Sequence, residues 1–121
     1  MKSILFVEDD SFLVDIYVTK LKEIGLSVTT AVDGEECLRK IEKQVPDILL
    51  LDIVLPHNNG WEILRKIKKN DKYNKVKVII LSNLGQKEEV KKGLKLGAEK
   101  YLIKAHYTPS EVVKEIRKIL K

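Results

Sequence analysis

Several features that stabilise small secreted proteins or anchor membrane proteins are scarce or missing in this sequence of 121 residues. Its single cysteine, Cys37, excludes an internal disulfide, so the fold must be held by its core. No apolar run approaches the roughly 18 residues that a membrane-spanning helix needs. The apolar run after Lys2 ends at Val7 and is shorter than the roughly 7–15 residues of a signal-peptide core. We therefore expect no membrane span and no signal peptide, and we expect the reducing cytoplasm as the compartment.

Negative charge is scarce only in the last quarter of the chain. Residues 91–121 carry nine Lys or Arg and three Asp or Glu, a balance of +6, whereas residues 1–90 have a balance of −1, so the total is +5. A basic segment of this kind can attract nucleic acid, anionic lipid or an acidic protein. A solvated, lysine-rich surface explains the same charge without any partner.

Five short apolar runs recur along the chain and predict β-strands at residues 4–7, 27–31, 48–51, 78–81 and 101–103. The first, third and fourth runs are unbroken, which is typical of strands that are buried on both faces of a parallel sheet. The run at 27–31 is more polar and suits an edge strand.

Between these runs the apolar residues recur with a helical period, and capping residues mark the helix ends. Gly25 ends a first helix, and Asp33, with a glutamate three residues on, opens a second. Asn59 caps a third helix, and a fourth ends near Gly97. A capping box that starts at Thr108, with proline at the first helical position, opens the last helix.

The strand–helix order repeats five times, without a linker, a sequence repeat or a low-complexity segment. This order predicts one α/β domain over residues 1–121, with a doubly wound five-stranded parallel sheet and helices on both faces. The expected strand order is 2-1-3-4-5, the flavodoxin-like arrangement.

Polar side chains interrupt the apolar pattern where the predicted strands end. Carboxylates follow the first and third strands, and a hydroxyl, an amide and an ammonium group follow the last two; the residues are Glu8, Asp9, Asp10, Asp52, Ser82, Asn83 and Lys104. In an open parallel sheet, ligands bind beyond the carboxyl ends of the strands, where the strand order reverses. That point lies between the first and third strands, so up to three carboxylates would share one crevice.

Carboxylates in close contact repel one another, so one of them takes a proton or a cation joins them. Oxygen ligands at partial exposure favour Mg²⁺, which keeps several waters and binds phosphate. A carboxylate of this crevice can also act as a nucleophile that forms an aspartyl phosphate. Ser82 can donate a hydrogen bond to a phosphoryl oxygen, and Lys104 can supply a positive charge. The combination suits phosphoryl transfer, although Asp10 is better explained as a helix N-cap.

With these motifs, the sequence resembles the receiver domain of two-component response regulators, of the chemotaxis-type single-domain form, over residues 4–120. The motifs that carry the resemblance are Val7-Glu8-Asp9-Asp10, Asp52-Ile53-Val54-Leu55-Pro56 with Gly60, Leu81-Ser82, Leu96-Gly97-Ala98 and Tyr101-Leu102-Ile103-Lys104. The resemblance implies a phosphorylation-activated signalling switch and not an enzyme. Such a switch assists its own phosphorylation and its own slow dephosphorylation.

The resemblance also implies a metal site. Asp52 matches the phosphoacceptor, and Asp9 and Asp52 match the residues that bind Mg²⁺, or Mn²⁺, directly. Glu8 would act on the ion through water, and the backbone carbonyl of Val54 would be the third protein ligand.

The same resemblance implies switch residues and partners. Ser82 matches the switch hydroxyl, Tyr101 the switch aromatic and Lys104 the phosphate-contacting lysine. It implies a histidine kinase or a phosphotransfer protein as donor, and an output surface on the fourth helix, fifth strand and fifth helix. Because this segment is basic, we expect an acidic protein as output partner. We expect no direct binding to nucleic acid or membrane.

Ala105 departs from the family pattern, in which proline usually follows the lysine through a cis peptide bond. A cis bond to alanine costs roughly 3–4 kcal/mol, against about 0.5–1 kcal/mol for proline. The need for Lys104 to reach the phosphate favours a retained cis bond, in which case Ala105→Pro would be stabilising. A trans, re-routed loop is the alternative.

Some residues and functions have plainer interpretations. We expect Cys37 in the core, His57 and His106 on the surface without a metal role, and Trp61 over the start of the third helix. A phosphatase with an aspartyl nucleophile would usually carry a second aspartate where Val54 stands. A phosphorylation-independent adaptor of the same fold would not need the acidic residues. The chain fits either a single-domain regulator or a receiver taken from a longer protein.

Overall fold

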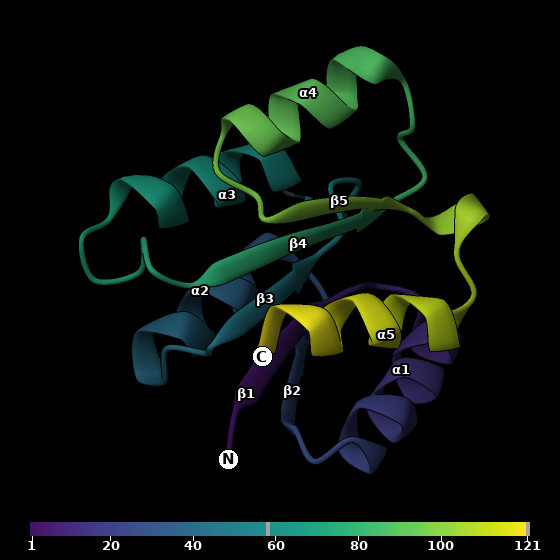
Figure 1. Cartoon of the computed structure of the whole chain (residues 1–121). Coiled ribbons are helices and arrows are strands. Elements are labelled where there is room, and N and C mark those ends of the chain that lie inside the picture. Colours follow the sequence, from purple (N-terminus) through teal and green to yellow (C-terminus); the bar gives the residue numbers. More distant parts are fainter. Residues whose placement is uncertain (58, 121) are drawn as a thin grey trace.

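Five parallel β-strands form the centre of the computed structural model, which describes residues 1–57 and 59–120. The strands are β1 (Ser3–Val7), β2 (Ser27–Ala31), β3 (Ile48–Leu51), β4 (Lys77–Ser82) and β5 (Lys100–Ile103). The helices are α1 (Ser11–Glu23), α2 (Gly34–Lys43), α3 (Gly60–Lys69), α4 (Lys87–Lys95) and α5 (Pro109–Leu120), with one 3-10 turn, η1 (Lys104–His106), before α5. Strands and helices alternate as the sequence predicts (Figure 1).

The strand order across the sheet is β2-β1-β3-β4-β5, and every neighbouring pair is parallel. This confirms the predicted flavodoxin-like order, and the polar strand β2 lies at an edge as expected. Val7 at the end of β1 pairs with Leu51 at the end of β3. The residues that follow these two strands therefore come together at the same end of the sheet, at the arrowheads in Figure 1.

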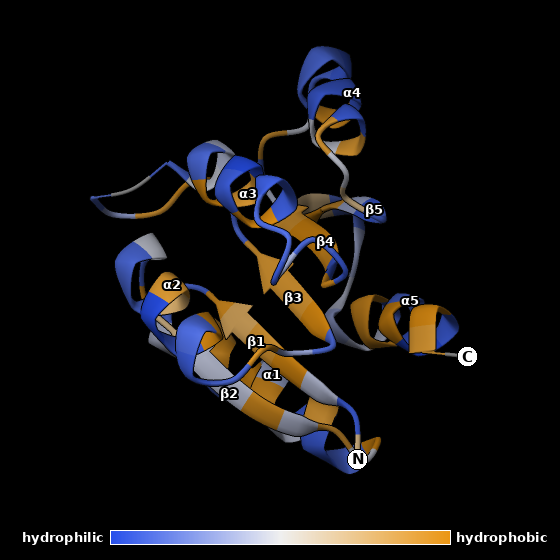
Figure 2. Cartoon of the chain, turned by 90° about the vertical axis from the view of Figure 1, so that its left-hand side faces the viewer, coloured by the Kyte–Doolittle hydropathy of each residue, from blue (hydrophilic) through white to orange (hydrophobic). Residues whose placement is uncertain are grey.

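Helices cover both faces of the sheet, and their hydrophobic sides face the strands (Figure 2). Helices α1 and α5 pack on one face, in a cluster that includes Phe6, Tyr17, Leu21, Val112 and Ile116. Helices α2 and α3 pack on the other face, in a cluster that includes Leu5, Cys37, Ile41, Leu51, Leu64 and Ile67. The buried position of Cys37 confirms that prediction. None of the described helices is long and apolar enough to cross a bilayer.

The predicted capping residues begin their helices. Asp10 accepts hydrogen bonds from the first backbone amides of α1, and Asp33 accepts one from the Glu36 amide at the start of α2. Asn59 caps α3. Thr108 and Glu111 each accept a hydrogen bond from the other's backbone amide, which is the predicted capping box. These caps fix where each loop ends and therefore where the polar residues of the strand ends lie.

The predicted cis bond at Lys104–Ala105 is wrong. All peptide bonds between described residues are trans, and the chain turns after β5 through η1. The physical reason is the high energy of a cis bond to a residue other than proline. The 3-10 turn re-routes the loop, and Lys104 still points into the crevice at the end of the sheet, as its contacts below show.

Candidate functional site

Two carboxylates lie side by side because β1 and β3 are neighbours. Glu8 directly follows β1, and its backbone amide donates to the carbonyl of Ala31 on β2. Asp52 directly follows β3, and its amide donates to the carbonyl of Val7 on β1. Glu8 and Asp52 are 2% and 5% exposed, so both carboxyl groups leave bulk water when the chain folds. Buried acids need a compensating charge or proton, and the site must supply one.

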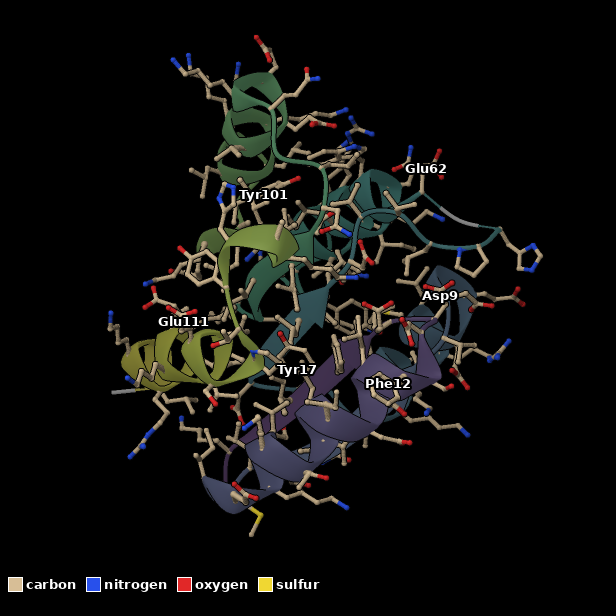
Figure 3. The ribbon with its side chains drawn as sticks, turned by 90° about the vertical axis from the view of Figure 1, so that its right-hand side faces the viewer. Asp9, Phe12, Tyr17, Glu62, Tyr101 and Glu111 are labelled. Atoms are coloured by element: carbon tan, nitrogen blue, oxygen red, sulfur yellow. The ribbon has the colours of Figure 1, made fainter. Side chains whose placement is uncertain are left out.

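A third carboxylate completes an acidic cluster. Asp9 is exposed, and one carboxylate oxygen from each of Glu8, Asp9 and Asp52 lies within 4.8 Å of the other two. Figure 3 shows the Asp9 side chain where the chain passes from β1 into α1. The sequence prediction that these three residues share one crevice is therefore confirmed as geometry.

Lys104 supplies the positive charge for the two buried carboxylates. Its Nζ atom donates to Glu8 Oε1 at 2.6 Å and to Asp52 Oδ2 at 2.8 Å. Burial alone would lower the pKa of Lys104, but the hydrogen bonds to Asp52 and Glu8 outweigh it and raise that pKa above its usual value. Lys104 therefore remains protonated and links the ends of three strands.

The pKa of Glu8 is shifted by burial and by the same lysine. Burial raises the pKa of Glu8, although its contacts with Lys104 and with the Asp10 amide act in the opposite direction. A divalent cation near this carboxylate would favour its ionised form, so the site is suited to binding further positive charge.

The loop after β3 fixes the position of the Asp52 side chain and of its backbone. The Val54 amide donates to Asp52 Oδ1 at 3.1 Å, while the Val54 side chain is 58% exposed. Gly60, the first residue of α3, donates its amide to the Ile53 carbonyl at 2.9 Å. A Cβ atom at Gly60 would lie 2.5 Å from Ile53 Cα and 2.7 Å from the Asp52 carbonyl oxygen. Only glycine lets α3 approach the Asp52 loop this closely.

The strand ends on the other side of Asp52 carry the predicted hydroxyl and aromatic residues. Ser82 is fully buried, and its Oγ accepts a hydrogen bond from the Leu84 amide at 3.3 Å. The Tyr101 hydroxyl donates to the Leu84 carbonyl at 2.5 Å. Burial, followed by the negative charge of Glu89, raises the pKa of Tyr101. Ser82 and Tyr101 therefore hold the same loop, the one between β4 and α4.

Trp61 connects the loop after β3 to α4, a contact that the sequence did not reveal. Its ring lies 6.5 Å from the Tyr101 ring, and the Lys92 ammonium sits 4.5 Å from its centroid. Trp61 is mostly buried at the start of α3, as predicted. A Cβ atom at Gly93 would lie 2.8 Å from the Tyr101 ring. Gly93, a glycine inside a helix, is the sequence feature that could have indicated this close packing of α4 against Tyr101.

Other predicted residues lie outside the acidic cluster. Asp10 caps α1 as expected, and His57 and His106 are exposed. Phe12, which the sequence analysis did not single out, is 74% exposed on the first turn of α1, where Figure 3 labels it. Asn83 is exposed.

Comparison with known proteins places this geometry in a family. The sequence profile of the response regulator receiver domain matches residues 4–117. The chain is 36% identical over 122 residues to PhoP, the alkaline phosphatase synthesis transcriptional regulatory protein of Bacillus subtilis (strain 168), covering 99% of this chain and 49% of PhoP. It is 35% identical over 120 residues to the probable transcriptional regulator ycf27 of Guillardia theta, covering 99% of this chain and 46% of that protein. The chain thus spans about half the length of these relatives.

Solved structures agree with the sequence comparison. The CheY-like response regulator receiver domain protein of Methanospirillum hungatei JF-1 superposes with a TM-score of 0.90 at 31% identity, covering 99% of this chain and 94% of that one. The chemotaxis response regulator CheY4 of Vibrio cholerae gives a TM-score of 0.90 at 25% identity, covering 98% of each chain. The fold, the acidic crevice and these matches show that the chain belongs to the response regulator receiver domain family of two-component systems.

Proposed function

We propose that the chain, as one receiver domain over residues 1–121, is a switch that accepts a phosphoryl group on Asp52. The observation that carries this proposal is the convergence of Glu8, Asp9 and Asp52 at one end of the sheet, with Lys104 in contact with two of them. A nucleophilic carboxylate, further acidic ligands and a cation are what phosphoryl transfer to an aspartate requires.

The residues present fit a divalent cation. Receiver domains bind Mg²⁺ at an acidic pocket, and oxygen atoms from three carboxylates lie within 4.8 Å of one another here. Asp9 and Asp52 would hold Mg²⁺, or Mn²⁺, directly, with the Val54 carbonyl as a third ligand and Glu8 acting through water. When bound, the ion neutralises charge on the carboxylates and on the phosphoryl oxygens.

The side chains of the crevice have separate tasks in the transfer. An oxygen of Asp52 forms a bond to phosphorus while the bond from phosphorus to the donor, a phosphohistidine of a histidine kinase or of a phosphotransfer protein, breaks. Lys104 then exchanges a contact with Asp52 for one with a phosphoryl oxygen, and the Ser82 hydroxyl donates to another. Water attack on the aspartyl phosphate reverses the state slowly, so the chain assists its own dephosphorylation without being an enzyme that acts on other molecules.

Phosphorylation would alter the surface formed by α4, β5 and α5, which is the surface that we expect an output partner to bind. Ser82 and Tyr101 both hold the Leu84 loop, so movement of Ser82 toward a phosphoryl group would free the tyrosine and reposition α4. This surface carries the basic segment, but Glu115 accepts from Lys100 at 2.5 Å and from Lys118 at 2.8 Å. The remaining positive charge suits an acidic protein partner better than nucleic acid.

Mass spectrometry of the intact protein tests the proposal directly. With Mg²⁺ and a small phosphodonor such as acetyl phosphate, the wild type should gain one phosphoryl group, and Asp52→Asn should gain none. Asp15→Asn, which removes an exposed carboxylate from α1, is the matched control and should label like the wild type. Undiminished labelling of Asp52→Asn would sink the assignment.

Metal binding can be measured separately from phosphorylation. Mg²⁺ titration followed by Trp61 fluorescence should saturate in the wild type, because the ion relieves the repulsion among the carboxylates. The affinity should fall strongly in Asp9→Ala, which removes one of the two direct carboxylate ligands. Equal affinity in both proteins would contradict the metal site.

A phosphorylation-independent adaptor of the same fold is the second candidate. Unchanged mass in every variant, with a partner still bound, would favour it.

The cytoplasmic location expected from the sequence stays a prediction.

A further inference from the structure

A second polar site lies at the end of the sheet opposite Asp52. A cavity of about 280 Å³ is formed where the chain enters β1, β3 and β4 and where α5 finishes its last turn. In Figure 1 this end carries the N-terminus of the chain and the last turn of α5. Four lysines line the cavity together with one carboxylate: Lys2, Lys72, Lys75, Lys77 and Asp47. Phosphorylation at Asp52 does not involve any of these residues.

The carboxylate of the cavity is already engaged. Asp47 Oδ2 accepts from the backbone amide of Ser3 at 2.8 Å and lies 3.4 Å from the Ser3 hydroxyl. These bonds tie the start of β3 to the start of β1. Asp47 therefore serves the backbone, and no ion pair joins it to a lysine within residues 1–57 and 59–120.

Among the four lysines of the cavity, the ammonium group of Lys77 alone has a partner among the described residues. Lys77 donates its amide to the Asp47 carbonyl, and its ammonium lies 3.4 Å from the Ile119 carbonyl. This contact with the end of α5 accounts for Lys77, since cations stabilise helix C-termini. It does not account for the other three, whose ammonium groups make no hydrogen bond or ion pair with any described residue.

The turn that carries two of these lysines is fixed by its own contacts. The Asn70 side chain accepts from the Lys72 amide at 2.8 Å. Lys68 donates to the Val76 carbonyl at 2.8 Å and so ties the end of the turn to α3. Lys72 and Lys75 therefore project from an ordered turn.

The chemistry of the lining selects the ligand. Lysine ammonium groups act as point charges and bind phosphate without the planar, two-bond geometry of arginine. The floor between them is apolar and includes Pro46, Ile48 and Val76, which are buried. None of the described residues that line the cavity is aromatic, so they provide no ring on which a nucleobase could stack. The volume is close to the lower limit of small-molecule sites.

We propose that this cavity binds a small polyanion with a phosphate chain, of the class of pyrophosphate and tripolyphosphate or their short esters. Several phosphate groups would meet several ammonium groups at once and relieve the repulsion among them. The phosphates of nucleic acid share this chemistry, and the test below separates the two sources.

Calorimetric titration with sodium tripolyphosphate in Mg²⁺-free buffer at physiological ionic strength tests the proposal. The wild type should bind one equivalent saturably, and the double variant Lys72→Gln/Lys75→Gln should bind about tenfold more weakly. The double variant Lys66→Gln/Lys69→Gln removes the same charge from exposed positions on neighbouring α3 and should change the affinity less than about twofold. Because all four side chains are exposed, equal melting temperatures should show that every variant folds.

Two outcomes would overturn the proposal. The first is the absence of saturable binding to the wild type, or an equal loss in both double variants, which would make the attraction a diffuse effect of net charge. The second is binding of a short DNA duplex that depends on Lys72 and Lys75 when tripolyphosphate does not bind. Amide chemical shifts near Asp47 and Lys77, and not near Asp52, should mark the bound site in the supporting case.

Discussion

Gly60→Ala is the substitution for which the structure makes the sharpest prediction. The new methyl carbon would lie 2.5 Å from Ile53 Cα, 2.7 Å from the Asp52 carbonyl oxygen and 2.8 Å from the Ile53 carbonyl oxygen. All three atoms belong to the backbone, so no side chain can rotate away to make room. The loop that carries Asp52 must therefore move away from α3.

The size of the effect follows from three contributions. Forcing an extra methyl group into packed surroundings costs about 1–3 kcal/mol. Weakening the hydrogen bond from the Gly60 amide to the Ile53 carbonyl costs about 1 kcal/mol more. The better helix propensity of alanine returns less than about 1 kcal/mol at this terminal position. The free energy of unfolding should fall by about 2.5 kcal/mol, which lowers the melting temperature by about 10 °C.

Gly25→Ala is the matched control because its glycine is needed for the opposite reason. Gly25 has a φ of 89°, but nothing lies within 4 Å of a Cβ atom placed there. Alanine in this left-handed conformation costs about 1–2 kcal/mol without touching the site.

Thermal unfolding and the rate of phosphorylation by acetyl phosphate separate the two variants. Gly60→Ala should be the less stable and should also be phosphorylated more slowly, since Asp52 moves with its loop. Gly25→Ala should lose stability alone. If Gly60→Ala melts within about 2 °C of the wild type, the close approach of α3 to this loop does not limit the site.

The remaining predictions concern the re-routed loop, the core and one surface pair. Ala105→Pro should lower stability by about 1–3 kcal/mol, because a proline disfavours the helical conformation of Lys104 before it; an unchanged or higher melting temperature would contradict the trans turn. Cys37 should resist iodoacetamide at about pH 8 until urea unfolds the chain, since burial raises its pKa to about 12; mass spectrometry reports this. Ion pairs with Lys100 and a second lysine lower the pKa of Glu115 to about 2. The contribution of these ion pairs to the stability of the fold should therefore be present above the unfolded pKa of about 4.3 and be lost as the pH falls toward 2. Lys100→Met should cost no more than about 1 kcal/mol at neutral pH, with the difference from wild type vanishing near pH 2 in acid-unfolding curves.

Most of the fold could be predicted because its signals are local. The unbroken run at 48–51 and the capping residues Asp33 and Thr108 act over a few neighbouring residues, and the structure has them as expected. The strand order then follows from few allowed topologies. The meeting of Glu8 with Asp52 could be predicted too, because parallel neighbours end together.

What could not be predicted depends on contacts between distant segments. Nothing in the sequence near Lys104 shows that it pairs with Glu8, which is 96 positions away. The contact of Lys92 with Trp61 and the lysine-lined cavity arise in the same way, from residues that only the assembled fold brings together. The prediction of a cis bond failed for another reason. It assumed that the isomer of the Lys104–Ala105 bond decides whether the Lys104 side chain reaches the crevice.

The strand register, and not the isomer of the following bond, fixes where Lys104 reaches. Ile103 pairs with Ser82 on β4, so Lys104 leaves the sheet level with the residue that follows Ser82. Asp52 lies one strand beyond β4, and strands are separated by about 4.8 Å, so the distance is within the span of a lysine side chain meeting a carboxylate. Lys104 Nζ does lie 2.8 Å from Asp52 Oδ2 with a trans bond behind it. A chain with this register can therefore exchange the usual proline for alanine and keep its cation in the crevice.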